Sequence, residues 1–249
     1  MNLKHIASCS GGKDSVASLI LAKQYGEPLD EVVYCEVMFD KETSGEVPEH
    51  RDFIYTRLKP FVENHLNVPF TILKSNKTYI DIFTHIVTRG QNMGLHSGFP
   101  IPGMCVVNRD LKIPPIKNYW KQQSDEVVQY VGIASDEEKR LVRLQGTNKT
   151  SLLQKYKIPK CQTGKICAKH NLLSPIYEFT NRNGCWFCMN CKDAEWSHLI
   201  YNHSHLFDKL VELEQKFPDR SRRCLTHNET PIQIKNRIMQ YGIQTTLFN

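Results

Sequence analysis

A glycine turn near the start of the chain carries the strongest chemical signal in the sequence. The segment Ser10-Gly-Gly-Lys-Asp-Ser15 follows a short apolar run and precedes a predicted helix that begins at about Asp14. Two glycines, Gly11 and Gly12, let the backbone turn tightly and bring amide N–H groups close to an anion, and the positive end of the helix points at the same place. Lys13 adds a positive charge, and the two serines add hydroxyl donors. The segment therefore predicts a polyphosphate cradle.

The spacing within this turn differs from that of two common phosphate motifs. It is neither Gly-x-x-x-x-Gly-Lys-Ser/Thr nor Gly-x-Gly-x-x-Gly. The alternative is a plain Gly-Gly turn capped by serine and aspartate. We disfavour it because a strand, a glycine loop and a helix follow one another in order.

A second group of basic residues is expected near the same ligand. Arg109 and Lys112 are three residues apart on a predicted helix and therefore share a face. Arginine would grip an anion with a planar fork and lysine with a compact charge. Arg140 lies just past a predicted strand that ends at Ile133. The alternative is that all three are ordinary charges on exposed helices.

Three cysteines with regular spacing form the second chemical signal. In the segment Cys185-Trp-Phe-Cys188-Met-Asn-Cys191, two residues separate each cysteine from the next. Such turns suit a tetrahedral metal or an iron–sulfur cluster, because their sulfurs can converge on one centre. The alternatives are a redox or sulfur-carrying thiol pair and unmodified structural thiols. The candidates for a fourth ligand are Cys105, Cys161, Cys167 and His170, unless the position stays open.

The elements that must position these residues alternate along the first half of the chain. Strands are predicted at 5–8, 31–37, 69–73 and 126–133, and helices from about 14, at 48–66, at 79–87 and at about 108–122. Strands separated by helices of this length predict an α/β fold with a doubly wound, mostly parallel, Rossmann-like sheet. Ligands of such sheets bind beyond the carboxyl ends of the strands, where the glycine turn and the segment after Ile133 are both expected.

The pattern changes from about Lys149 onward, where short polar helices surround the cysteine turn. Thr230 and Pro231 have the types of an N-cap and a first helical residue and predict the start of a last helix. We therefore predict a nucleotide-binding α/β domain at 1–148 and a small helical, basic region with the cysteines at 149–249. This second part carries 15 basic and 8 acidic side chains, against 17 and 18 in the first part. The excess indicates an anionic partner, with nucleic acid as the leading candidate, or simply a solvated basic surface.

Composition excludes several other classes of protein. The chain has 249 residues, 40% of them hydrophobic, and a net charge of +6, which is typical of a globular protein and not of a disordered one. The longest uncharged run, at 90–108, is interrupted by glycine and proline and predicts a loop instead of a membrane span. The amino terminus lacks the apolar core of a secretory signal, so we expect a cytoplasmic protein whose nine cysteines stay reduced.

Several segments together resemble a known family. The turn at Ser10–Ser15 resembles the PP-loop of the adenine nucleotide α-hydrolase superfamily, and other segments resemble its phosphoadenosine phosphosulfate (PAPS) reductase-like branch. Cys105-Val-Val-Asn-Arg109-Asp-Leu-Lys112-Ile-Pro114 looks like the Cys, Arg, Leu-Lys and Pro signature of that branch, and Gly132–Arg140 looks like its Gly-Ile segment ending in arginine. Gly184-Cys-Trp-Phe-Cys188 is similar to a later cysteine motif of some relatives.

The resemblance implies a particular chemistry. Enzymes of this superfamily hold the pyrophosphate of ATP with Mg²⁺ while a substrate oxygen attacks the α-phosphorus, and a sulfur or nitrogen nucleophile then displaces AMP. Lys13, Asp14 and Ser15 would be catalytic, and Ser10–Ser15 with Arg109, Lys112 and Arg140 would bind the nucleotide or substrate. Cys185, Cys188 and Cys191 would hold an iron–sulfur cluster or zinc, or carry sulfur.

Two other functions stay open at this point. One is reduction or transfer of sulfate from PAPS, which is disfavoured because the tail lacks the Glu-Cys-Gly-Leu-His motif and Cys224 is a weak substitute. The other is a nucleotide-dependent module that binds nucleic acid through the basic carboxyl-terminal region. The expected partners are an adenine nucleotide and an acceptor, which nucleic acid would fit, but no membrane. A homodimer is one of the states that the sequence allows.

Overall fold

The computed structural model describes residues 3–101, 103, 105–123 and 126–241. The chain forms two compact units that are interleaved along the sequence. The first, called the sheet unit here, contains Met1–Glu36, Pro48–Lys74 and Pro115–Glu178. The second, called the helical unit, contains Val37–Val47, Ser75–Pro114 and Phe179–Asn249.

These units differ from the division predicted at residue 148. Residues 149–178 belong to the sheet unit, because Lys149–Thr150 pairs with the strand Glu126–Val131 and Lys160–Lys169 packs on the first helix. Residues 37–47 and 75–114 belong to the helical unit. The change of composition near Lys149 does not mark the boundary, since packing across the sequence decides which segments share a core.

Five parallel strands form the centre of the sheet unit, in the order β3-β2-β1-β5-β6. They are β1 (Leu3–Ser8), β2 (Glu31–Glu36), β3 (Phe70–Lys74), β5 (Glu126–Val131) and β6 (Lys149–Thr150). Every neighbouring pair is parallel, which confirms the predicted α/β fold. The order turns at β1, with β2 and β3 on one side and β5 and β6 on the other. Such a turning point opens a crevice at the carboxyl ends of the two central strands.

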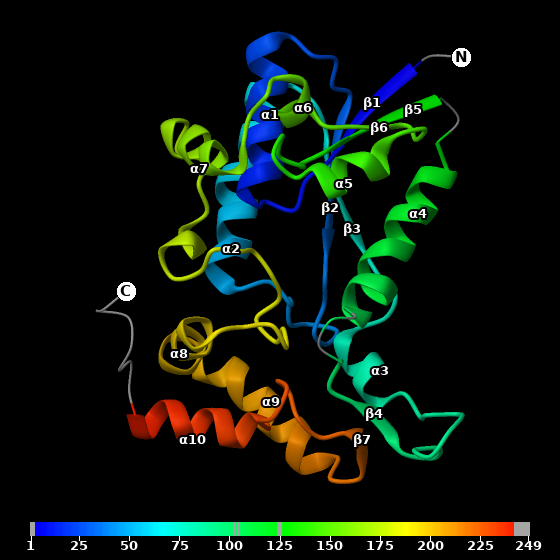
Figure 1. Ribbon diagram of the computed structural model, residues 1–249, viewed down its shortest axis with the longest axis vertical. Coiled ribbons are helices and arrows are strands. Elements are labelled where there is room, and N and C mark those ends of the chain that lie inside the picture. The colour runs from blue at the N-terminus through cyan, green and yellow to red at the C-terminus, as the bar shows by residue number, and fades with distance from the viewer. Residues whose placement is uncertain (1–2, 102, 104, 124–125, 242–249) are drawn as a thin grey trace. The chain divides into compact units, whose positions relative to one another are not determined.

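Helices flank this sheet and complete its core. They are α1 (Lys13–Tyr25), α2 (Pro48–Phe53), α5 (Glu138–Leu141), α6 (Leu152–Lys155) and α7 (Lys160–Lys169), and the chain enters the unit again within α4 (Ile113–Lys121). Helical turns continue beyond α2 to His65, as the apolar periodicity predicts. In Figure 1, α1, α6 and α7 lie side by side, in agreement with their contacts. The buried residues of α1, at 16–22, are all apolar except Ser18, because both the sheet and these helices cover this part of the helix.

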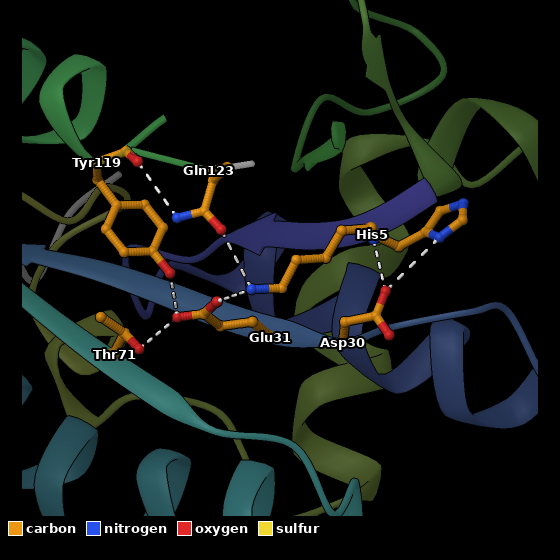
Figure 2. A network of polar contacts seen from close by, with 7 residues as sticks. His5, Asp30, Glu31, Thr71, Tyr119 and Gln123 are labelled. Carbon is orange, nitrogen blue, oxygen red and sulfur yellow. Dashed lines mark hydrogen bonds and ion pairs between the residues drawn. The ribbon is translucent and has the colours of Figure 1, made fainter. Parts of the chain in front are cut away.

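A network of polar contacts ties together the amino ends of the strands (Figure 2). The carboxylate of Glu31 accepts hydrogen bonds from Lys4 Nζ at 3.0 Å, from Tyr119 Oη at 2.5 Å and from the hydroxyl of Thr71. Burial alone would raise the pKa of Glu31, but these hydrogen bonds lower it. The strands are parallel, so this network occupies the edge opposite the glycine turn and leaves the carboxyl edge to a ligand.

The helical unit packs around aromatic side chains. Its elements are α3 (Tyr79–Thr84), α8 (Asp193–Asn202), α9 (Ser204–Lys216), α10 (Pro231–Tyr241) and the parallel pair β4 (His96–Gly98) and β7 (Arg220–Arg222). Trp186, Phe187, Trp196 and Phe207 are buried in its core. The last helix begins at Pro231, as predicted. The run at 90–108, predicted as a loop, contains β4, whose partner β7 lies more than a hundred residues later.

None of the helices in the described part of the chain is both long enough and apolar enough to cross a membrane.

Candidate functional site

The glycine turn lies at the turning point of the sheet, between β1 and α1. Gly12 is the N-cap of α1 and has no side chain that could cap the helix, while the amide of Lys13, the first helical residue, donates to Tyr177 Oη at 2.9 Å. The amides of Asp14 and Ser15 follow in the first turn, and the helix dipole favours a negative charge at this end. Gly11 has a φ of +74°, in the left-handed region that side chains disfavour. The sequence thus predicts the conformation of the turn correctly, and phosphate binding there stays a prediction.

A buried histidine is hydrogen-bonded to the backbone of this turn. The side chain of His50, on α2, is fully buried, with Nε2 3.0 Å from the carbonyl oxygen of Ser10 and Nδ1 2.9 Å from Ser174 Oγ. A carbonyl can only accept, so Nε2 carries the proton and Nδ1 accepts from the serine hydroxyl. The histidine thus fixes the backbone immediately before Gly11. The role of His50 is not apparent from the sequence, because a single histidine in a predicted helix carries no spacing signal.

Two glycines permit close packing around the turn. A Cβ atom on Gly11 would lie 2.9 Å from atoms of both His50 and Ile54. A Cβ atom on Gly132, which follows β5, would lie 2.6 Å from the backbone nitrogen of Ser15. The segment after β5 therefore reaches the start of α1, as expected for the two carboxyl ends that border the crevice.

Lys13 is held by residues that come from the end of the sheet unit. Its backbone N–H donates to Tyr177 Oη at 2.9 Å, and its ammonium lies 5.2 Å from the centre of the Tyr177 ring. The thiol of Cys167 donates to the Lys13 carbonyl at 3.2 Å. Burial raises the pKa of Tyr177 to about 12, so its hydroxyl stays protonated. Within the described ranges no carboxylate forms an ion pair with the Lys13 ammonium, which leaves its charge for a ligand.

Asp14 and Ser15, both predicted to be catalytic, make structural contacts in this state of the protein. Asp14 Oδ1 accepts a hydrogen bond from Thr163 Oγ1 at 2.7 Å, which joins α1 to α7. Ser15 Oγ donates to the Gly12 carbonyl at 2.9 Å and accepts from the Cys9 thiol at 3.4 Å. Both side chains hold the turn in shape, and their predicted catalytic role stays a prediction.

Arg140, the third predicted anion ligand, has an acidic partner close by. Its Nη1 lies 2.8 and 2.9 Å from the two carboxylate oxygens of Glu137, and its side chain is half exposed. Burial raises the pKa of Glu137, but hydrogen bonds from Arg140 and from the Ala134 amide outweigh this effect and lower it. A ligand anion at Arg140 would have to share the guanidinium with Glu137.

Arg109 and Lys112 belong to the helical unit. They share the turn Asn108–Lys112, but they pair with different carboxylates. Arg109 grips Asp110 with two hydrogen bonds, of 2.6 and 2.8 Å, and Lys112 Nζ lies 3.7 Å from Glu46 Oε1. That both bind one anion stays a prediction.

The three cysteines lie on two consecutive turns. The amide of Cys188 donates to the Cys185 carbonyl at 3.1 Å, and the amide of Cys191 donates to the Cys188 carbonyl at 2.9 Å. Trp186 anchors these turns, since its indole N–H donates to the Ser44 carbonyl at 2.8 Å. Cys105 is the fourth-ligand candidate that belongs to the same unit, and its charge contributes to the pKa of Cys185, which burial raises.

Arg182 places a positive charge against two of these thiols. Its Nη2 lies 3.1 Å from Cys191 Sγ, and its Nη1 lies 3.6 Å from Cys188 Sγ. Glu195 holds the guanidinium at 2.9 Å. The hydrogen bond from Cys191 and the charge of Arg182 lower the pKa of Cys188, although burial opposes them. In the described part of the chain the three sulfurs do not all lie within 4.8 Å of one another, so a shared metal centre, iron–sulfur or zinc, stays a prediction. The role of Arg182 is not apparent from the sequence.

Comparisons with known proteins add little to this description. No family model matches the chain, and no curated protein matches it. Among solved structures, it is similar to the U34-tRNA thiolase NcsA from Methanococcus maripaludis with its [4Fe-4S] cluster. The TM-score is 0.42 and the sequence identity is 16%, over 96% of this chain and 71% of that one. The proposals that follow therefore rest on the residues of this chain.

Proposed function

We propose that this chain is a PP-loop ATP pyrophosphatase that adenylates a substrate. The observation that supports the proposal is the glycine turn at the turning point of the sheet, where the start of α1 lies beside the ammonium of Lys13, which forms no ion pair among the described residues. The motifs around Arg109 and Gly132, which resemble the PAPS reductase-like branch, support the same assignment. Sheet topology and loop chemistry thus favour the same ligand, the pyrophosphate part of ATP.

The proposed reaction places the turn around the leaving group. An oxygen of the substrate attacks the α-phosphorus, the bond between that phosphorus and the bridging oxygen breaks, and pyrophosphate leaves with both electrons of this bond. Amides of Gly11 and Gly12, with Lys13, would stabilise the charge that develops on pyrophosphate. Removal of one such donor typically costs about 3–4 kcal/mol of barrier. Mg²⁺, when bound, would share this charge.

The cysteine turns supply the second half of the proposal. Cys185, Cys188 and Cys191 would hold an iron–sulfur cluster or zinc, or carry sulfur, next to the positive charge of Arg182. A cluster with three protein ligands would leave one iron free for a sulfide. In the second step, a sulfur nucleophile at the oxidation level of sulfide would attack the carbon that bears the adenylated oxygen, and AMP would leave with that oxygen and the electron pair of the broken carbon–oxygen bond, so that a carbon–sulfur bond replaces it.

The acceptor in this proposal is a nucleic acid. The excess of basic residues at 149–249 supports it, because phosphate groups are held mainly by lysine and arginine. Binding of RNA or DNA should weaken steeply between low and moderate salt. No measurable binding at low salt would remove nucleic acid as the acceptor.

Labelled ATP tests the central step. With ATP labelled at the α- or γ-phosphate and a total RNA fraction as acceptor, we expect labelled AMP and labelled pyrophosphate. Lys13→Met should abolish the formation of both products. It should also abolish the binding of ATP that pyrophosphate competes for in the unaltered protein. Lys23→Met is the matched control, because Lys23 lies in the last turn of the same helix and bonds the His65 carbonyl. Steady release of ADP and phosphate would reject the proposal.

A further inference from the structure

The helical unit contains a cavity of about 530 Å³ whose lining includes Arg109 but none of the residues of the glycine turn. Residues of α3, β4, β7 and the turn Asn108–Lys112 line it. Its walls are largely apolar, and among them are Ile82, Val87, Phe99 and Val106. Binding sites for small molecules commonly have this volume, with apolar walls and a few polar groups. The polar groups of this cavity therefore indicate which ligand it would take.

Arg222, on β7, brings an uncompensated charge to this cavity. Its Nε atom is buried and has no hydrogen-bond partner among the described residues. The Nε atom of Arg220, two residues earlier, is also buried without a partner, but the rest of its guanidinium donates to the carbonyls of Glu214, Phe217 and Arg223 at 2.8–3.0 Å. Arg222 is half-buried, and among the described residues no carboxylate pairs with its guanidinium, so this charge is open to an anion.

The backbone of Arg222 is fixed by the pairing of β7 with β4. The amide of Phe99 donates to the Arg222 carbonyl at 3.3 Å, and a Cβ atom on Gly98 would lie only 2.3 Å from that oxygen. The close approach of β4 and β7 requires glycine at position 98. Arg222 is therefore anchored at the wall of the cavity, in contrast to a lysine or arginine on a free surface.

The two carboxylates that line the cavity are already engaged. Asp81 accepts hydrogen bonds from the amide and the hydroxyl of Thr78, at 2.7 and 2.9 Å, at the start of α3. Asp110 is gripped by Arg109. Lys77 and Arg109 are the other cations of the lining; Arg109 is paired with Asp110, and Lys77 forms no ion pair with any carboxylate in the described parts of the chain. The charge left over in the cavity is positive.

We infer that this cavity binds a nucleoside monophosphate unit, with the phosphate on Arg222 and Lys77 and the base against the apolar walls. Arginine and phosphate form paired, charge-assisted hydrogen bonds. Ser97, Ser221 and His85 also line the cavity and offer the donors and acceptors that a base edge and a ribose need. The unit would come from a free mononucleotide or from a nucleotide within an RNA strand. This site is separate in its residues from the ATP turn and does not depend on it.

Calorimetric titration with uridine 5′-monophosphate (UMP) and with uridine tests the inference. The intact chain should bind UMP at least tenfold more tightly than uridine. Arg222→Gln should reduce UMP binding to the level of uridine, and Lys77→Gln, at an exposed position, should weaken it several-fold. Arg223→Gln is the matched control, since Arg223 is exposed and does not line the cavity. It should bind UMP as the unaltered protein does.

Titration with a trinucleotide of uridine distinguishes a nucleotide within an RNA strand from a free mononucleotide. Tighter binding than UMP indicates a strand, and equal or weaker binding indicates a free mononucleotide. Equal affinities for UMP and uridine, or an unchanged affinity in a folded Arg222→Gln variant, would overturn the inference. Loss of UMP binding in Lys13→Met would also overturn it, because UMP would then occupy the glycine turn. Conversely, ATP binding that survives Lys13→Met contradicts the proposed function and leaves this inference untouched.

Discussion

Replacement of Gly11 by alanine should damage the protein through two separable effects. The first is the backbone: at a φ of +74° a residue with a Cβ atom costs about 1–2 kcal/mol. The second is space, since the new methyl carbon would lie 2.9 Å from atoms of His50 and Ile54, both fully buried. Overpacking of this kind costs about 1–3 kcal/mol. The unfolding free energy should therefore fall by about 2–5 kcal/mol in Gly11→Ala.

Gly26 offers a control with only the first effect. It ends α1 with a φ of +63°, and a Cβ atom there would have nothing within 4 Å. Gly26→Ala should therefore cost only about 1–2 kcal/mol, from the left-handed backbone alone. Alanine restricts the unfolded chain equally in both variants, so this contribution cancels in the comparison. The difference between the variants, about 1–3 kcal/mol, measures the clash with His50 and Ile54.

Urea unfolding at pH 7 gives the two free energies, and titration with pyrophosphate gives the effect on the site. Gly11→Ala should lose pyrophosphate binding, because the methyl group must displace either the turn or the histidine beneath it. Gly26→Ala should keep it. If Gly11→Ala is as stable as Gly26→Ala, or if it binds pyrophosphate normally, our account of the turn and its support by His50 is wrong.

Three further predictions test other parts of the structure. Tyr177→Phe removes the acceptor of the Lys13 amide, so the free energy of unfolding measured in urea should fall by about 1 kcal/mol. Saturating ATP should reduce this loss, because a phosphate oxygen then accepts from the amide in place of the hydroxyl. An equal loss of stability with and without ATP contradicts this prediction. Arg182→Gln should lower the iron or zinc content per chain after anaerobic purification, and Arg182→Lys, which keeps the charge, should lower it less; unchanged content in both would count against a metal beside Arg182. For Asp40, burial raises the pKa, but hydrogen bonds from the Thr43 amide and Lys209 lower it from 3.8 to about 2. The ionised carboxylate therefore contributes up to about 2 kcal/mol to the free energy of unfolding, which is present above pH 4 and lost as the pH falls toward 2. Asp40→Asn should destabilise the protein more at pH 7 than at pH 3. A loss of stability that does not vary with pH would refute this prediction.

Local signals in the sequence were sufficient for the fold class and for the phosphate turn. Gly11 and Gly12 lie between an apolar strand and a helix, so their role follows from neighbours a few residues away. The alternation of short apolar runs and helical stretches predicted the parallel sheet, because each strand and helix has its own periodicity. The spacing of Cys185, Cys188 and Cys191 likewise predicts two consecutive turns, which the structure shows, whereas a metal held by their thiols stays a prediction.

Contacts between distant residues were decided only by the tertiary structure. Tyr177 bonds the Lys13 amide across 164 positions of sequence, and His50 meets Ser174 across 124. The interleaving of the two units, and the anchoring of Arg222 by Gly98, arise in the same way. No spacing rule predicts such pairs, since a residue's type and neighbours specify its local backbone, whereas its partners depend on which faces the whole chain buries together.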